Sequence, residues 1–258
     1  MDNLLWKDLE DLQLYAKLKR VKRESRVARE RSEDAVTWNV IRGLEKANVL
    51  GPWLESVSGL KAPRPSVAYW SCDKATGYTL GLLDEARLAF DETHNKGTEP
   101  DVIVDTETTL FFVEAKFTSG NRTRPSEPAR ATRYVEGGQG WYAQVMQAPF
   151  AQVAVGAHFY ELVRMWLLGT WAAQQRGVAF CLVNLVGAAR EPGVEAAFGR
   201  FIARSDQRRF KRGTWEGALA HLQAVRRLDP ITTELEHYML QKTAGYGSDG
   251  GLRSGFSL

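Results

Sequence analysis

Apolar residues recur at helical spacing in the first fifty positions of the chain. Between residues 4 and 19 they stand three or four positions apart, at Leu5, Leu9, Leu12, Tyr15 and Leu18. This spacing predicts an amphipathic helix whose apolar face covers the core or a partner subunit. A second helix is predicted to begin at about Ser32, a residue type that favours helix N-caps, and to present an apolar stripe as far as Leu44.

The middle of the chain alternates turn-forming residues with short apolar runs. Glycines and prolines between residues 51 and 65 predict a loop, and residues 66–72 predict a strand. Residues 83–90 are predicted to be helical. Residues 101–105 and 110–116, which flank a short polar turn, predict a β-hairpin.

The second half has longer apolar segments after a polar stretch at residues 118–140. Helical periodicity predicts helices over residues 142–157, 160–174 and 214–228. The continuous apolar run at residues 178–186 predicts a buried strand. Five glycines among residues 243–258 indicate a flexible tail.

Composition is ordinary for a globular protein, with 44% hydrophobic and 25% charged residues in 258. No linker divides the chain, so we expect a basic amphipathic helix at 1–31, one domain at 32–242 and the tail. Cys72 and Cys181 lie far apart and are predicted to be reduced packing residues. No apolar run is long enough to cross a membrane and no leader sequence is recognisable, so a cytoplasmic protein is expected.

Positive charge is concentrated although the net charge is only +3. Residues 17–31 and residues 200–212 form two basic blocks, and further arginines stand at Arg122, Arg124, Arg130 and Arg133. A solvated helix face would explain such blocks. Clustered arginines also neutralise phosphates, which favours a polyanion partner.

The hairpin carries the strongest candidate for chemistry. Twelve residues separate Asp101 from Glu114, and Lys116 follows Glu114 at the spacing that places both on one face of a strand. If Thr106 and Glu107 form a two-residue turn, Asp101 falls opposite Phe112 and diagonal to Glu114. Two carboxylates at that separation can reach one magnesium ion.

A lysine beside two carboxylates and a metal can orient a water and offset charge on a phosphate, which is the chemistry of phosphodiester hydrolysis. A cross-strand ion pair on a solvated face is the alternative for Glu114 and Lys116. The apolar run at residues 110–113 predicts instead a buried strand, in which unpaired charges are costly.

Pro100-Asp101 followed by Glu114-Ala115-Lys116 resembles the signature of the PD-(D/E)xK nuclease superfamily. The resemblance covers about residues 32–186. It implies an α/β domain of the restriction-endonuclease-like type, with a mixed central sheet flanked by helices and here an extra N-terminal helix. It also implies Asp101, Glu114 and the Ala115 carbonyl as ligands of Mg²⁺ or Mn²⁺, and Lys116 as the residue that aligns the water.

Members of that superfamily often add an acidic residue from the first core helix. Glu33 is the best match, although an acidic residue there would also favour the helix dipole, and Glu85 is the next. Gln139, Tyr142 and Gln144 lack the QxxxY spacing of the exonuclease branch.

Arg122 and Arg124 directly follow the lysine strand and are predicted to contact a phosphate backbone, although an ordinary exposed loop is an alternative. Phe210 and Trp215, which lie among basic residues, are interpreted as core residues.

We therefore expect a metal-dependent nuclease acting on nucleic acid, with DNA the favoured substrate. The alternatives are a nucleic-acid-binding module of the same fold without turnover and a protein-interaction domain. A homodimer is also expected, because the N-terminal amphipathic helix needs an apolar partner. Fold analogy alone does not decide among these functions.

Overall fold

Five strands form one mixed sheet at the centre of the protein. The structure is a computed structural model that describes residues 4–21, 32–93, 97–126, 132–225 and 229–245. The strands lie in the order in which they occur along the chain: β1 (Ser66–Tyr69), β2 (Val102–Asp105), β3 (Thr109–Ala115), β4 (Ala179–Val186) and β5 (Arg208–Thr214). β1, β2 and β3 run antiparallel, whereas β3, β4 and β5 run parallel.

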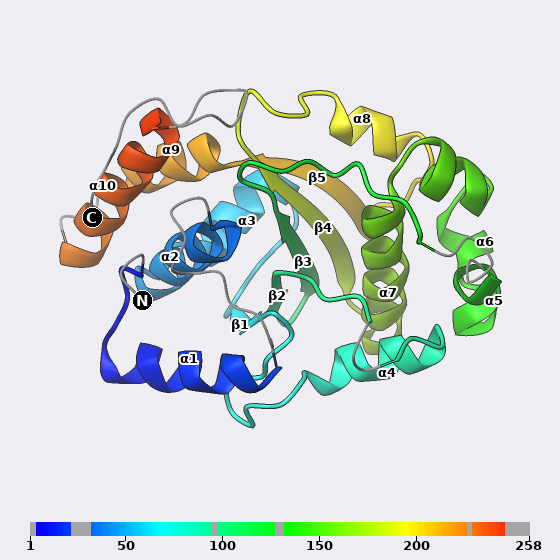
Figure 1. Cartoon of the computed structure of the whole chain (residues 1–258), viewed down its shortest axis with the longest axis horizontal. Helices are drawn as coiled ribbons and strands as arrows, with labels where there is room; N and C mark the ends of the chain where they lie inside the picture. Colours follow the sequence, from blue (N-terminus) through cyan, green and yellow to red (C-terminus); the bar gives the residue numbers. More distant parts are fainter. Residues whose placement is uncertain (1–3, 22–31, 94–96, 127–131, 226–228, 246–258) are drawn as a thin grey trace.

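Helices cover both faces of this sheet (Figure 1). One face packs against α1 (Leu9–Val21), α2 (Glu33–Lys46), α3 (Leu50–Ser58), α9 (Trp215–Val225) and α10 (Pro230–Gly245). The other packs against α4 (Gly81–Ala89), α5 (Thr132–Gly140), α6 (Tyr142–Val145), a π-helical segment (Ala151–Gly156), α7 (Tyr160–Arg176) and α8 (Val194–Gly199). The protein is therefore an α/β fold with a mixed sheet flanked by helices, as predicted.

The two central strands are buried on both faces because helices cover both sides of the sheet. Every residue of β3 and of β4 is buried. Such strands read as continuous apolar runs rather than as alternating patterns. Glu114 and Asn184, which face each other across β3 and β4, interrupt these runs with polar side chains. Polar groups at that depth need specific partners.

Several elements match the sequence prediction closely. The Ser32 hydroxyl accepts a hydrogen bond from the Ala35 backbone and caps α2, as expected. The predicted helices at 83–90 and 160–174 correspond to α4 and α7, and the hairpin to β2 and β3. Phe210 and Trp215 are core residues, and the thiols of Cys72 and Cys181 are free and buried.

Four predictions about elements were wrong. Residues 50–58 form α3 rather than a loop, because a proline in the first turn of a helix costs no hydrogen bond. The helix expected at 142–157 is interrupted at Pro149, and the polar stretch at 118–140 contains α5. α10 ends at Gly245, within the segment predicted as a tail. Residues 246–258, and residues 226–228 of the helix predicted at 214–228, lie outside the described residues.

Helix α1 lies on the chain's own core through part of the predicted apolar face. Tyr15 and Leu18 are buried as predicted, whereas Leu9 and Leu12 are 73% and 40% exposed and Leu14 is buried instead. Asp11 is also buried, because Arg42 and Lys46 of α2 pair with its carboxylate at 2.7 and 3.0 Å. The apolar face of α1 is thus covered within one chain, which removes the argument for a homodimer based on this helix.

None of the helices in the described part of the chain is long and apolar enough to cross a membrane.

Candidate active site

The hairpin places Asp101 and Glu114 directly opposite each other rather than diagonally. Asp105 pairs with Leu110 and Val102 with Val113, so the next step of the same register aligns Asp101 with Glu114. The predicted register was wrong by two residues because the turn is built differently. The Thr106 backbone N–H donates to the Thr109 carbonyl at 3.1 Å, which leaves Glu107 and Thr108 at the tip.

A shift of two residues leaves every side chain on its predicted face, since strand side chains alternate with a period of two. The two acidic residues are therefore closer than the diagonal arrangement would place them. Asp101 is also held by the backbone. The Ala115 N–H donates to Asp101 Oδ2 at 2.9 Å, and the Trp70 N–H donates to the Asp101 carbonyl at 2.9 Å.

Lys116 lies between two carboxylates. Its Nζ is 2.5 Å from Glu114 Oε1 and 3.0 Å from Glu161 Oε2. Glu161 belongs to the first turn of α7, which packs on β3 and β4. Its backbone N–H donates to Thr123 Oγ1 at 2.9 Å, which ties the start of α7 to the loop after β3. The sequence reasoning did not identify Glu161.

The electrostatics of this cluster are those of crowded carboxylates around one cation. Burial, with the neighbouring Asp101 charge, raises the pKa of Glu114 well above its usual range even though Lys116 opposes the shift. Burial alone would lower the pKa of Lys116, but the carboxylates of Glu114 and Glu161 outweigh it and raise that pKa. Lys116 is therefore charged at neutral pH, whereas folding disfavours the ionised form of Glu114.

Neighbouring elements fix the backbone of Lys116 on both sides. Its N–H donates to the Leu185 carbonyl of β4 at 2.8 Å, and its carbonyl accepts from Trp215 Nε1 at 3.1 Å. Lys116 thus continues the alignment with β4 beyond the end of β3. Because the backbone is fixed, the ammonium group can move only by rotation about the side-chain bonds of Lys116.

A buried amide pair lies beside Glu114 and holds the following loop. Asn184 and Asn121 exchange hydrogen bonds at 2.9 and 3.0 Å between their side-chain amides. Asn121 also donates its backbone and side-chain N–H groups to the Glu191 carboxylate. The loop after β3 is therefore anchored next to the acidic cluster.

Arg122 and Arg124 lie in that loop and are exposed. The Thr123 N–H donates to the His158 carbonyl at 2.8 Å, which places the loop beside the start of α7. Arg124 Nε donates to His158 Nε2 at 2.9 Å. Burial lowers the pKa of His158, and the positive charges of Arg124 and Arg122 lower it further. Two guanidinium groups therefore lie close to the helix that carries Glu161.

Glu33 lies at the start of α2, near Lys116, and binds the loop that follows this lysine. Its Oε1 accepts backbone hydrogen bonds from Phe117, Thr118 and Ser119 at 2.8, 3.0 and 2.9 Å, and the Ser119 hydroxyl donates to it as well. Burial raises the pKa of Glu33, but these bonds and nearby Lys116 outweigh burial, so the pKa is lowered. Glu33 thus fixes the loop after Lys116, whereas Glu85 is exposed on α4.

Three residues of the second basic block make internal contacts. Arg209 donates to the Ser58 carbonyl, Lys211 pairs with Glu195, and Arg212 donates to three carbonyls between residues 187 and 190. Residues 22–31 of the first block, and Arg130, lie outside the described residues.

The side chains of this cluster determine whether a divalent cation could bind there. Within the described ranges, no group of three or more His, Cys, Asp or Glu side chains is already arranged to hold a metal ion. Asp101 and Glu114 nevertheless offer oxygen ligands of the type that Mg²⁺ prefers. Burial first, and then the Asp101 charge, raise the pKa of Glu114, and a cation between the two carboxylates would offset the contribution of Asp101. The residues present therefore fit a hard divalent cation.

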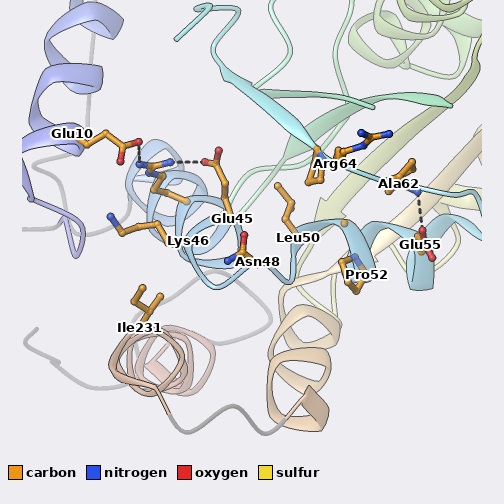
Figure 2. Close-up of a pocket in the computed structure, with 14 residues that line it drawn as sticks. Glu10, Glu45, Lys46, Asn48, Leu50, Pro52, Glu55, Ala62, Arg64 and Ile231 are labelled. Atoms are coloured by element: carbon orange, nitrogen blue, oxygen red, sulfur yellow. Dashed lines mark hydrogen bonds and ion pairs between the residues drawn. The ribbon is translucent and has the colours of Figure 1, made fainter. Parts of the chain in front are cut away.

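A cavity of about 910 Å³ lies among α2, α3 and α10, on the face of the sheet that these helices cover (Figure 2). Its charged groups bind one another. Arg42 pairs with Glu10 at 2.7 Å and with Glu45 at 2.9 Å, and the Glu55 carboxylate accepts from the Ala62 N–H at 2.9 Å. The pair with Glu10 holds α1 on α2, the Glu55 bond holds the loop after α3, and neither supports an assignment of catalysis.

Comparisons of this chain with models of known protein families, with curated proteins and with solved structures found no match.

Proposed function

We propose that this protein is a divalent-metal-dependent nuclease that hydrolyses phosphodiester bonds, with DNA as the favoured substrate. One observation carries the proposal. Asp101 and Glu114 are aligned on neighbouring strands, and Lys116 follows on the same face with its ammonium against Glu114. This supports the restriction-endonuclease-like type of α/β fold, as do the β2–β3 hairpin and the parallel strand β4.

In this proposal Asp101, Glu114 and the Ala115 carbonyl hold Mg²⁺ or Mn²⁺, which supplies Lewis-acid stabilisation of charge on the phosphate when bound. Lys116 is protonated at neutral pH, because its pKa is raised. It therefore orients the attacking water by donating a hydrogen bond and cannot accept the proton of that water. Arg122 and Arg124 contact the phosphates on either side.

Glu161 is the carboxylate best placed to accept the water proton. Its side chain is 32% exposed and lies 3.0 Å from Lys116 Nζ, whereas that of Glu114 is only 4% exposed. A proton acceptor must lie within hydrogen-bond reach of the water that Lys116 orients. We therefore assign the role of the third acidic residue to Glu161 rather than to Glu33, whose Oε1 already accepts backbone hydrogen bonds from residues 117–119.

The test is cleavage of supercoiled, linear and single-stranded DNA with Mg²⁺ or Mn²⁺. Wild type is compared with Asp101→Ala, Lys116→Ala and Glu161→Gln, each checked for an intact fold by circular dichroism. Glu85→Gln is the matched control, because that carboxylate is exposed and distant in sequence from the cluster. Chelation of the metal by EDTA is the control for metal dependence.

We expect wild type and Glu85→Gln to cut at equal, metal-dependent rates and the three site variants to lose most activity. Removal of a proton acceptor or of a positioned donor typically costs about 100-fold or more in rate. Metal-dependent cutting that survives in Asp101→Ala or Lys116→Ala would contradict the proposal and point to a contaminating nuclease.

A second candidate is a nucleic-acid-binding module without turnover. The ion pairs of Lys116 with Glu114 and Glu161 favour it, because they already neutralise part of the charge that a metal would neutralise. In that case wild type would bind DNA without cutting it, and Lys116→Ala would bind equally well.

A further inference from the structure

A second pocket, of about 350 Å³, lies at the opposite end of α7 from Glu161. It is lined by Ala89, Gly138, Gln139, Trp141, Gln144, Trp171 and Gln175. None of these side chains is charged. The lining combines two indole rings with three side-chain amides, which is a neutral surface with hydrogen-bonding edges.

The three glutamines of this pocket keep their amide groups available. Gln139, Gln144 and Gln175 are exposed, and none of their side chains makes a hydrogen bond to another described residue. Each amide offers an acceptor and two donors. Three such groups around one cavity can match a ligand that carries both donors and acceptors on one edge.

The backbone at this pocket is strained in a way that favours a binding role. Gln139 has φ 62° and follows Gly138 at φ 58°, so a non-glycine residue occupies the left-handed region. Residues held in that region cluster at ligand sites, where the strain maintains a required geometry. Here the left-handed conformation is kept at a glutamine that lines the pocket.

The indole rings are set in fixed positions. A Cβ atom on Gly138 would lie 2.9 Å from Trp171 Cδ1, so the ring packs directly on the glycine backbone. Trp141 is 6% exposed, and its Nε1 donates to Thr170 Oγ1 at 2.9 Å. The Arg208 guanidinium lies 5.8 Å from the centre of the Trp141 ring and makes no ion pair within the described ranges.

We propose that this pocket binds one unpaired nucleobase of a single-stranded nucleic acid. The π face of a base stacks on Trp171, the glutamine amides bond its hydrogen-bonding edge, and Arg208 contacts the adjoining phosphate. The inference rests on the proposed function in so far as it takes nucleic acid as the ligand. It adds to that function a preference for unpaired strands.

The pocket and Glu161 lie toward opposite ends of the same helix. Trp171 stands ten positions after Glu161 on α7, which at the rise of an α-helix is about 15 Å. The residues between them are mostly buried, so a strand that reached both places would pass over the elements that cover α7.

The test measures binding without cleavage. Short single-stranded oligonucleotides that each carry one 2-aminopurine are titrated with the full chain in EDTA, and the fluorescence of the base reports stacking. Gln139→Gly and Gln175→Ala are compared with wild type. Gln174→Ala is the matched control, because Gln174 is exposed on the same helix and does not line the pocket.

We expect quenching of the 2-aminopurine on binding and a dissociation constant about fivefold higher in each pocket variant, as for the loss of one hydrogen bond. Gln139→Gly is expected not to lower the thermal midpoint, because glycine adopts positive φ without penalty. If Gln139→Gly has a higher dissociation constant but an unchanged thermal midpoint, then Gln139 acts in binding and not in holding the fold. Gln174→Ala should bind as wild type does.

Equal dissociation constants in all four proteins, or unquenched 2-aminopurine in a bound strand, would overturn the pocket and leave the nuclease proposal standing. Quenching that depends on Gln139, in a protein that never cuts, would support the pocket and contradict the nuclease proposal. An oligonucleotide that does not bind wild type at all would overturn the pocket, whereas the nuclease proposal would still be decided by the cleavage test with metal.

Discussion

Replacing Gly169 with alanine would place a methyl group in the contact between α7 and the sheet. A Cβ atom there would lie 2.2 Å from two ring atoms of Phe180 and 3.1 Å from Phe112. Both rings are buried and already meet edge to face at 5.4 Å. Overpacking of this kind costs about 3 kcal/mol, and the better helix propensity of alanine returns about 1 kcal/mol.

The expected net loss is about 2 kcal/mol of unfolding free energy, which lowers the thermal midpoint by about 4–8 °C for a chain of this size. Moving α7 outward also moves Glu161 away from Lys116, so metal-dependent cleavage should fall in the folded variant. Both effects are measured on the same preparation, by thermal unfolding and by DNA cleavage.

Gly81→Ala is the matched control. Gly81 is the exposed first residue of α4, and nothing lies within 4 Å of an added Cβ atom. The same substitution should there leave stability unchanged within about 0.5 kcal/mol. A Gly169→Ala variant as stable as Gly81→Ala would refute the close packing of α7 on which the position of Glu161 depends.

Further predictions concern single side chains. Glu33→Gln should cost about 2 kcal/mol at neutral pH by weakening charge-assisted bonds to the backbone at Ser119. Because the pKa of Glu33 is lowered from 4.5, the difference from wild type should disappear in urea unfolding as pH falls through that lowered pKa. Because the pKa of Glu114 is raised from 4.5, folding favours its protonated form. Without metal, wild type should therefore lose stability relative to Glu114→Gln as pH rises above 4.5. The Cys181 thiol should resist alkylation in the native protein, as followed by mass spectrometry, because burial raises its pKa.

The sequence was sufficient for the hairpin and its faces but not for its register. Because side chains alternate faces along a strand, the positions of Asp101, Glu114 and Lys116 predicted one shared face, and a shift of two residues preserves that face. The turn depends on the Thr106 hydroxyl, which accepts from the Thr109 N–H at 2.9 Å and donates to its carbonyl at 2.7 Å. A turn that is closed by hydrogen bonds from a threonine hydroxyl to the backbone is hard to recognise from sequence.

Glu161 and Glu33 show why the third acidic residue could not be assigned from sequence. Both occur in the first turn of a helix, where acidic residues favour the helix dipole without any further role. Their surroundings differ because α7 packs on β3 beside Lys116, whereas the start of α2 faces the loop at Ser119. That difference arises from tertiary packing.

Binding of Mn²⁺ to the purified protein is the first measurement to make on the proposed metal site, because it requires no knowledge of which nucleic acid is cut. Free Mn²⁺ is measured by electron paramagnetic resonance during titration of wild type, Asp101→Asn and the control Glu85→Gln. We expect saturable binding by wild type and by Glu85→Gln that is strongly weakened in Asp101→Asn. Equal binding by all three proteins, or none by wild type, would contradict a metal site formed by Asp101 and Glu114.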